Sequence, residues 1–199
     1  MVRDIKIKSK KVIIASDHAG FKLKEEIKKY LIKKRKKVLD LGTKNTSSVD
    51  YPDLAHRLSK KIILASDHAG FKLKEEIKKF LIKKRKKVLD LGTKNTNSVD
   101  YPDYAHLLSK KMKKDKNQFG ILICGSGTGM SMAANKHKNI RAALCYDAKS
   151  TKLSRLHNNA NVMTIGSRLI KKNVALKCVN TFLKTDFDGG RHLRRVKKI

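Results

Sequence analysis

The chain has 199 residues and a net charge of +32 at neutral pH, from 49 lysines and arginines and 17 acidic residues. This length allows one or two domains with a hydrophobic core, and no apolar run approaches the ~20 residues that span a bilayer. The sequence therefore excludes a membrane-spanning protein, and we expect no membrane partner.

The positive charge is spread along whole segments, as in EEIKKFLIKKRKK at residues 75–87. Aromatic residues do not alternate with these lysines as they do in surfaces that stack nucleic-acid bases. We therefore expect solvated helix faces and no specific nucleic-acid partner, with salt-sensitive binding to polyanions in general.

The three cysteines, Cys124, Cys145 and Cys178, form no CxxC motif, and no histidine stands at zinc-ligand spacing from them. An odd number of such cysteines predicts free thiols in a reducing cytoplasm and no structural metal.

The sequence repeats itself at an offset of 50 residues. Residues 11–60 (copy one) recur as residues 61–110 (copy two). The six differing pairs are Val12/Ile62, Ile14/Leu64, Tyr30/Phe80, Ser47/Asn97, Leu54/Tyr104 and Arg57/Leu107. The segment that follows has no duplicate. We therefore predict an enzyme domain at residues 61–199, preceded at residues 1–60 by a non-catalytic extra copy of its first half.

Copy two begins with an apolar run at residues 62–65, which predicts a buried strand. A helix should follow, because Leu73, Ile77, Phe80 and Leu81 share one helical face. Residues 88–91 predict a second strand, and a further helix should begin near Tyr101, with Pro102 in its first turn.

Three more strands are predicted at residues 119–123, 141–146 and 162–165. Helices should lie after Gly129, around residues 154–157 and over residues 174–183. Strands that alternate with helices predict a five-stranded parallel, doubly wound (Rossmann-like) α/β sheet. Copy one predicts an additional βαβα unit in front of it.

Either copy could fill the sheet. If copy one did so, copy two would form a connection about 50 residues longer, which costs only ~1–2 kcal/mol of chain entropy. We expect copy two in the sheet because it is continuous with the segment that follows.

Polar clusters come directly after three predicted strands: Asp67-His68, the loop from Cys124 to Gly129, and Gly166-Ser167-Arg168. Ligands of open α/β sheets bind at the carboxyl ends of strands. The glycine loop enters a helix and predicts an anion site, although it matches neither the P-loop nor GxGxxG. A thiol at Cys124 beside a helix N-terminus should have a lowered pKa and act as a base or nucleophile; the alternative is an inert buried cysteine.

Near the C-terminus, Arg191 and Arg195 would share one face of a helix, with His192 beside Arg195. Two guanidinium groups on one face suit a phosphate dianion. The alternative is a basic tail without a ligand.

The motifs SDHAG, VDYPDYA, ILICGSGTGMSMAANK, SRLHNNANV, IGSR and GGRHLRRV follow one another along residues 61–199. In this order and spacing they resemble the ribose-5-phosphate isomerase B family, whose wider group includes the subunits of galactose-6-phosphate isomerase. Copy one resembles only the opening segment of that family.

The resemblance implies interconversion of ribose 5-phosphate and ribulose 5-phosphate through an enediolate, as in the pentose phosphate pathway, without a cofactor or metal. It makes Cys124 the base and His157 the residue that opens the sugar ring. Ser126 stands where many members have threonine and keeps its hydroxyl. The loop residues that would hold the enediolate oxygens are Gly125, Gly127, Thr128 and Gly129.

The remaining roles concern substrate binding. The resemblance places Asp67, Tyr101 and Asn158 around the sugar. Around the phosphate it places His68, Arg168, Arg191 and Arg195, and His192 beside Arg195 is a further candidate for substrate binding. It also implies a homodimer or tetramer with shared active sites, in which His157, Asn158 and Arg168 serve the neighbouring subunit. Two alternatives stay open: an isomerase of galactose 6-phosphate or another aldose 6-phosphate, and a non-catalytic relic that binds polyanions.

Overall fold

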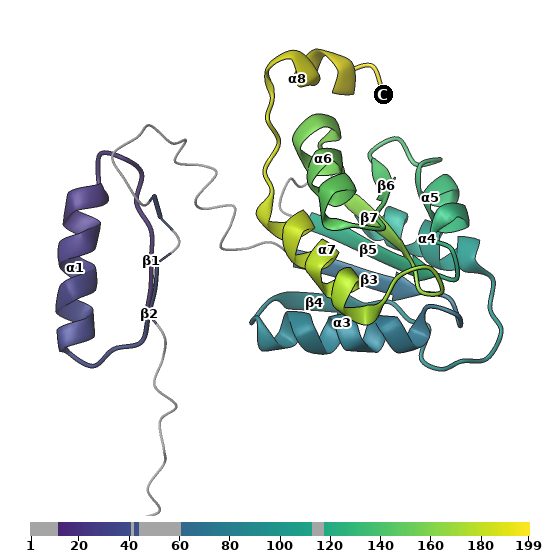
Figure 1. Ribbon diagram of the computed structural model, residues 1–199, viewed down its shortest axis with the longest axis horizontal. Helices are drawn as coiled ribbons and strands as arrows, with labels where there is room; N and C mark the ends of the chain where they lie inside the picture. Colours follow the sequence, from purple (N-terminus) through teal and green to yellow (C-terminus); the bar gives the residue numbers. More distant parts are fainter. Residues whose placement is uncertain (1–11, 41, 44–60, 113–117) are drawn as a thin grey trace, which may run out of the picture. The chain divides into compact units, whose positions relative to one another are not determined.

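The computed structural model describes residues 12–40, 42–43, 61–112 and 118–199. The chain divides into two units, Met1–Ser59 and Lys60–Ile199, and each is described by itself (Figure 1). None of the described helices is long and apolar enough to cross a membrane.

The second unit is built on five parallel strands in the order β4-β3-β5-β7-β6. The strands are β3 (Lys61–Ser66), β4 (Lys87–Asp90), β5 (Gln118–Cys124), β6 (Ala142–Leu144) and β7 (Val162–Gly166). This confirms the predicted doubly wound sheet and places copy two in it. Strand β6 is shorter than predicted because it lies at the edge and pairs only with β7, over residues 142–144.

Helices cover both faces of the sheet (Figure 1). They are α3 (Phe71–Lys83), α4 (Tyr101–Lys111), α5 (Thr128–Ala134), α6 (Ala148–Asn158) and α7 (Lys172–Lys184), and the short α8 (Gly190–Val196) lies beyond α6. Alternate residues of β3 enter different cores: Ile62 and Leu64 pack with α3 and α7, whereas Ile63 and Ala65 pack with α4 and α5. Successive side chains of a strand point to opposite faces, so an uninterrupted apolar run fills both cores.

The first unit contains β1 (Val12–Ile14), α1 (Phe21–Lys33) and β2 (Val38–Asp40), and the two strands form a separate parallel sheet. The predicted second helix of the βαβα unit falls outside the described residues.

Arg155 stabilises the C-terminal end of α6, where His157 and Asn158 lie, by hydrogen bonds to neighbouring segments. The side chain is only 5% exposed and donates hydrogen bonds to the backbone oxygens of Thr185, at 3.1 Å, and of Ala160. Its guanidinium also lies 4.9 and 5.5 Å from the ring centroids of Phe119 and Phe182. Burial lowers the pKa of Arg155 to about 10, which leaves it cationic at neutral pH.

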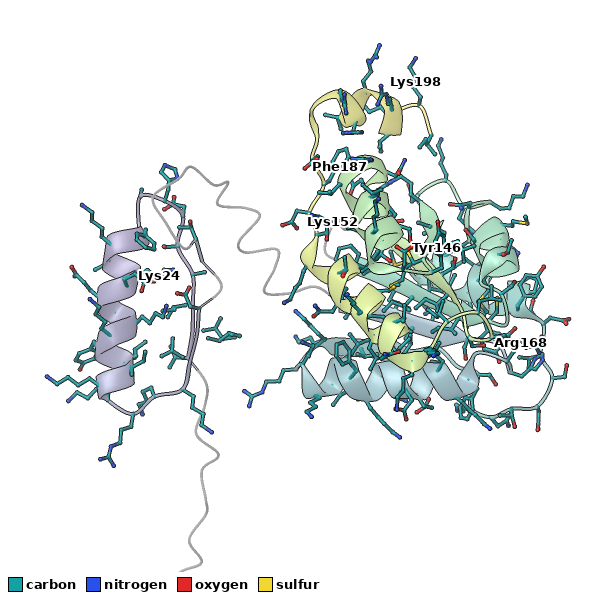
Figure 2. The ribbon with its side chains drawn as sticks, viewed as in Figure 1. Lys24, Tyr146, Lys152, Arg168, Phe187 and Lys198 are labelled. Carbon is teal, nitrogen blue, oxygen red and sulfur yellow. The ribbon has the colours of Figure 1, made fainter. Side chains whose placement is uncertain are left out.

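Replacing Arg155 by Met should lower the free energy of unfolding by about 2–4 kcal/mol, because two carbonyl groups lose a charged donor. The matched control is Lys152→Met on the exposed side of the same helix (Figure 2), which should change stability by less than about 0.5 kcal/mol. Urea unfolding of the two variants checks this expectation, and equal losses would contradict it.

Candidate functional site

A cavity of about 450 Å³ opens at the carboxyl ends of β3, β5 and β7. The predicted site residues that line it are Asp67, His68, Tyr101, Cys124, Gly125, Ser126, Gly129 and Arg168. Ala69 and Leu169 also line it, and sequence analysis did not single them out. Neither residue carries a reactive group. The only feature of the sequence that could have indicated them is that they follow His68 and Arg168 directly.

Cys124 is the last residue of β5 and is only 4% exposed. Its Sγ accepts a hydrogen bond of 3.0 Å from the backbone N–H of Gly127. Gly127 has φ +81°, and a Cβ there would lie 2.6 Å from Leu144 Cδ1 and 2.9 Å from Gly166 N. The turn therefore requires glycine, and it aims an N–H at the sulfur, where such a donor stabilises negative charge.

Helix α5 begins at Thr128, directly after this turn. The backbone N–H of Thr128 donates to Ser126 Oγ at 3.3 Å. The loop between Cys124 and α5 thus combines one thiol, one hydroxyl and the N–H groups at the start of a helix. That combination suits an oxygen that develops negative charge.

Backbone contacts join the three loops of the cavity. Ser167 N–H donates to Cys124 O at 2.8 Å and Arg168 N–H to Gly125 O at 3.1 Å. The hydroxyl of Ser167 donates to Ala69 O at 2.9 Å. These bonds hold the loops after β3, β5 and β7 in one arrangement.

Asp67 is 6% exposed, and its Oδ1 accepts the backbone N–H of Gly70 at 2.8 Å. Tyr101 begins α4 and forms another wall of the cavity. A Cβ at Gly129 would lie 2.6 Å from the Tyr101 ring, so the absence of a side chain there lets the ring approach the loop.

Other predicted site residues form a second group, away from this cavity. His157 of α6 and His192 of α8 stack with their ring centroids 4.3 Å apart and their planes 5° from parallel. Arg191 and Arg195 lie on α8, which confirms the predicted helix. In Figure 2, Arg168 of the cavity and Lys198, just beyond α8, lie at opposite sides of the unit.

Asn158 also lies apart from Cys124. It lines a different hollow, of about 330 Å³, together with Arg141 and His137. Within one chain, the structure therefore brings together the residues of the strand ends and leaves His157, Asn158, Arg191, His192 and Arg195 elsewhere.

His157, Asp188 and His192 have possible metal-ligand atoms within 4.8 Å of one another. The pKa of His192 is lowered by burial, by His157 and by the nearby charges of Arg191 and Arg195, whereas Asp188 acts to raise it. The two guanidinium groups are suited to an anion such as phosphate. We assign no metal to this group, and the metal-free site stays a prediction.

Comparisons with known proteins show what the whole chain is similar to. The family model described as Ribose/Galactose Isomerase matches residues 12–63 and again residues 62–199. Ribose-5-phosphate isomerase B of Escherichia coli K12 is 42% identical over 190 residues, which covers 96% of this chain and 94% of the relative.

Two solved structures are also similar. The ribose 5-phosphate isomerase of Thermotoga maritima has a TM-score of 0.67 and 51% identity, and the match covers 69% of this chain and 95% of that chain. Ribose-5-phosphate isomerase B of Mycoplasma genitalium, solved with bound ribulose-5-phosphate, has a TM-score of 0.67 and 46% identity over 69% of this chain and 92% of that chain. The chain therefore belongs to the ribose/galactose isomerase family.

Proposed function

We propose that the chain is an aldose–ketose isomerase that interconverts ribose 5-phosphate and ribulose 5-phosphate through an enediolate. The observation that carries this proposal is the Cys124 sulfur, which accepts the Gly127 N–H at 3.0 Å on the wall of a polar cavity. The Mycoplasma genitalium relative holds ribulose-5-phosphate, which supports a five-carbon substrate over a six-carbon aldose 6-phosphate.

The proton transfer begins at the Cys124 thiolate. It takes the proton from C2 of the open-chain aldose, and the electron pair of that C–H bond moves to the carbonyl group and leaves negative charge on O1. The Ser126 hydroxyl and the loop N–H groups from Gly125 to Gly129 stabilise this charge. The proton of the C2 hydroxyl then passes to O1, and the thiol returns its proton to C1, so that C2 becomes the carbonyl carbon of the ketose and the thiolate is restored.

The other residues bind and prepare the sugar. Asp67 and Tyr101 bind sugar hydroxyls, and His68 and Arg168 lie on the same cavity wall for the phosphate. His157 donates a proton to the ring oxygen so that the furanose opens. Energy from binding the remote phosphate orients the reacting carbons.

We also propose a homodimer with shared active sites. An isomerase of this kind needs the base, the ring-opening residue and the phosphate ligands around one substrate. Within one chain, His157, Arg191 and Arg195 do not line the cavity of Cys124. A second copy that places its α6 and α8 at the cavity would complete the site.

In this proposal residues 61–199 are the enzyme domain, and residues 1–60 are not required for catalysis while copy two is intact. The solved relatives support this division, because each matches about 69% of this chain but more than nine-tenths of its own. The three free cysteines support a reducing compartment, for which we propose the cytoplasm.

Changing Cys124 to Ala should lower the turnover number by about 10²–10⁴-fold, the usual contribution of a positioned base. The matched control, Cys178→Ala in the core, should keep its turnover. A coupled assay for ribulose 5-phosphate measures both, and an unchanged turnover number for Cys124→Ala would rule out the assigned base.

Limiting iodoacetamide near pH 7.5 should label Cys124 about tenfold or more faster than the other cysteines, because Cys124 borders the cavity. Burial raises the pKa of Cys145 to about 11 and also raises the pKa of Cys178, so both stay protonated at that pH. Peptide mass spectrometry gives the three rates, and ribose 5-phosphate should slow only the first. Equal rates would contradict an accessible Cys124.

Shared sites make a further prediction. When chains with Cys124→Ala and chains with His157→Ala are mixed and allowed to exchange subunits, each mixed dimer has one intact site. Random pairing should restore about a quarter of the wild-type activity. Chains that carry their whole site within themselves would stay inactive after mixing.

A further inference from the structure

The described part of copy one, residues 12–40, has the same local structure as residues 62–90 of copy two, although it lies outside the five-stranded sheet. Its strands pair in the equivalent register, with Val12 opposite Val38 where copy two has Ile62 opposite Val88. Helices α1 and α3 each have 13 residues. Apart from the three side chains that differ, residues 12–40 therefore have the same backbone arrangement as residues 62–90 for contact with a partner surface.

The polar contacts are also duplicated. Lys24 Nζ lies 3.0 Å from Asp40 Oδ2, and Lys74 Nζ lies 2.8 Å from Asp90 Oδ2. Asp17 Oδ1 accepts the Gly20 N–H at 2.9 Å, as Asp67 Oδ1 accepts that of Gly70 at 2.8 Å. The carboxylate that borders the cavity in copy two thus has a counterpart that is already held in the same way.

The two copies differ in what covers their apolar residues. Ile77 is fully buried, whereas the equivalent Ile27 is 43% exposed. Ile63 is 1% exposed and Ile13 is 53% exposed. Burial of this much apolar surface is strongly favourable, so copy one carries an apolar face without its usual covering.

Copy two shows which surface fits that face. Strand β3 pairs with β5, and α3 packs with α7 in one core. Glu76 of α3 lies 3.3 Å from Lys172, and the Ser167 hydroxyl donates to Ala69 O. Copy one has Glu26 and Ala19 at the corresponding positions, so it matches residues 118–199 in charge, hydrogen bonding and apolar shape.

We propose that copy one can replace copy two against residues 118–199 of the same chain, and that Asp17 and His18 then take the places of Asp67 and His68 in the active site. The same chain is the favoured source because the covalent connection gives a high effective concentration. This inference rests on the proposed function only where its tests measure isomerase activity; the structural replacement of one copy by the other does not depend on it.

Copy two prevails in the intact chain for two physical reasons. Ile62 is fully buried and has one methylene group more than Val12, and the copy-one arrangement needs a connection 50 residues longer. Both penalties are small compared with that of a charge in the core. A charged substitution in the core of copy two should therefore cause copy one to take its place in the five-stranded sheet.

Full-length Ile77→Asp tests this. The variant should keep activity within about tenfold of wild type, because copy one supplies the intact Ile27. The matched variant Ile27→Asp should behave as wild type, and the double variant Ile27→Asp/Ile77→Asp should be inactive. If Ile77→Asp alone is as inactive as the double variant, the proposal is overturned.

A second substitution tests the site itself. Adding Asp17→Asn to Ile77→Asp should remove the remaining activity, since Asp17 would then be the carboxylate that binds the sugar. Activity that persists would overturn the assigned role of Asp17. The specific activity of Ile77→Asp could fall on dilution while that of the wild type does not. This result would overturn the proposal that copy one packs against residues 118–199 of its own chain.

Hydrogen exchange keeps the proposal testable without any activity. In Ile77→Asp, amides of residues 12–40 should become protected and those of residues 62–90 should lose protection, the reverse of the wild-type pattern. The Tyr30/Phe80 difference gives the equivalent peptides different masses. Low protection of both segments would overturn the proposal that copy one replaces copy two, whether or not the chain isomerises sugars.

Discussion

The candidate site cavity depends on the backbone contact between three loops at the carboxyl edge of the sheet. Ser167 N–H donates to Cys124 O, and Asp67 N–H donates to Ile123 O at 3.2 Å. These bonds continue the pairing of β5 with β7 and β3 beyond the strands. Because the strands are parallel, all three loops emerge at one edge, and a thiol, a carboxylate and a guanidinium meet there.

Sequence patterns predicted this edge well because each strand is short, apolar and followed at once by polar residues. A parallel strand that is buried on both faces needs apolar residues throughout, so its end is easily recognised. Strand β6 was predicted too long because an apolar run does not reveal that only three residues face a partner strand.

Other features did not follow from the residue patterns of single segments. The two copies are nearly identical, so their residues alone cannot tell which one enters the sheet. Chain connectivity decides it, because copy two continues into β5. The family resemblance implied that His157 serves a neighbouring subunit, but the residues of α6 and α8 do not themselves show which surface of the fold these helices occupy.

The sequence likewise did not indicate that Asp188 lies beside His157. It lies close to His157 only because the segment after α7 returns along α6, where the Asp188 N–H donates to Leu156 O at 3.1 Å. The surrounding arginines give this group a positive field, and a phosphate brought to it by a neighbouring subunit would be attracted. In the proposed dimer the two groups would meet: the cavity would supply the base, and α6 and α8 of the neighbouring subunit would supply His157 and the arginines.

The central claim is that Cys124 moves a proton between two carbons of ribose 5-phosphate. The most direct measurement is NMR of the full-length protein with ribose 5-phosphate in D₂O. A thiolate base that exchanges its proton with solvent should give ribulose 5-phosphate with deuterium at C1, and Cys124→Ala should give almost none. Absence of the ketose from the wild-type reaction, or ketose formed by Cys124→Ala as fast as by the wild type, would contradict the claim.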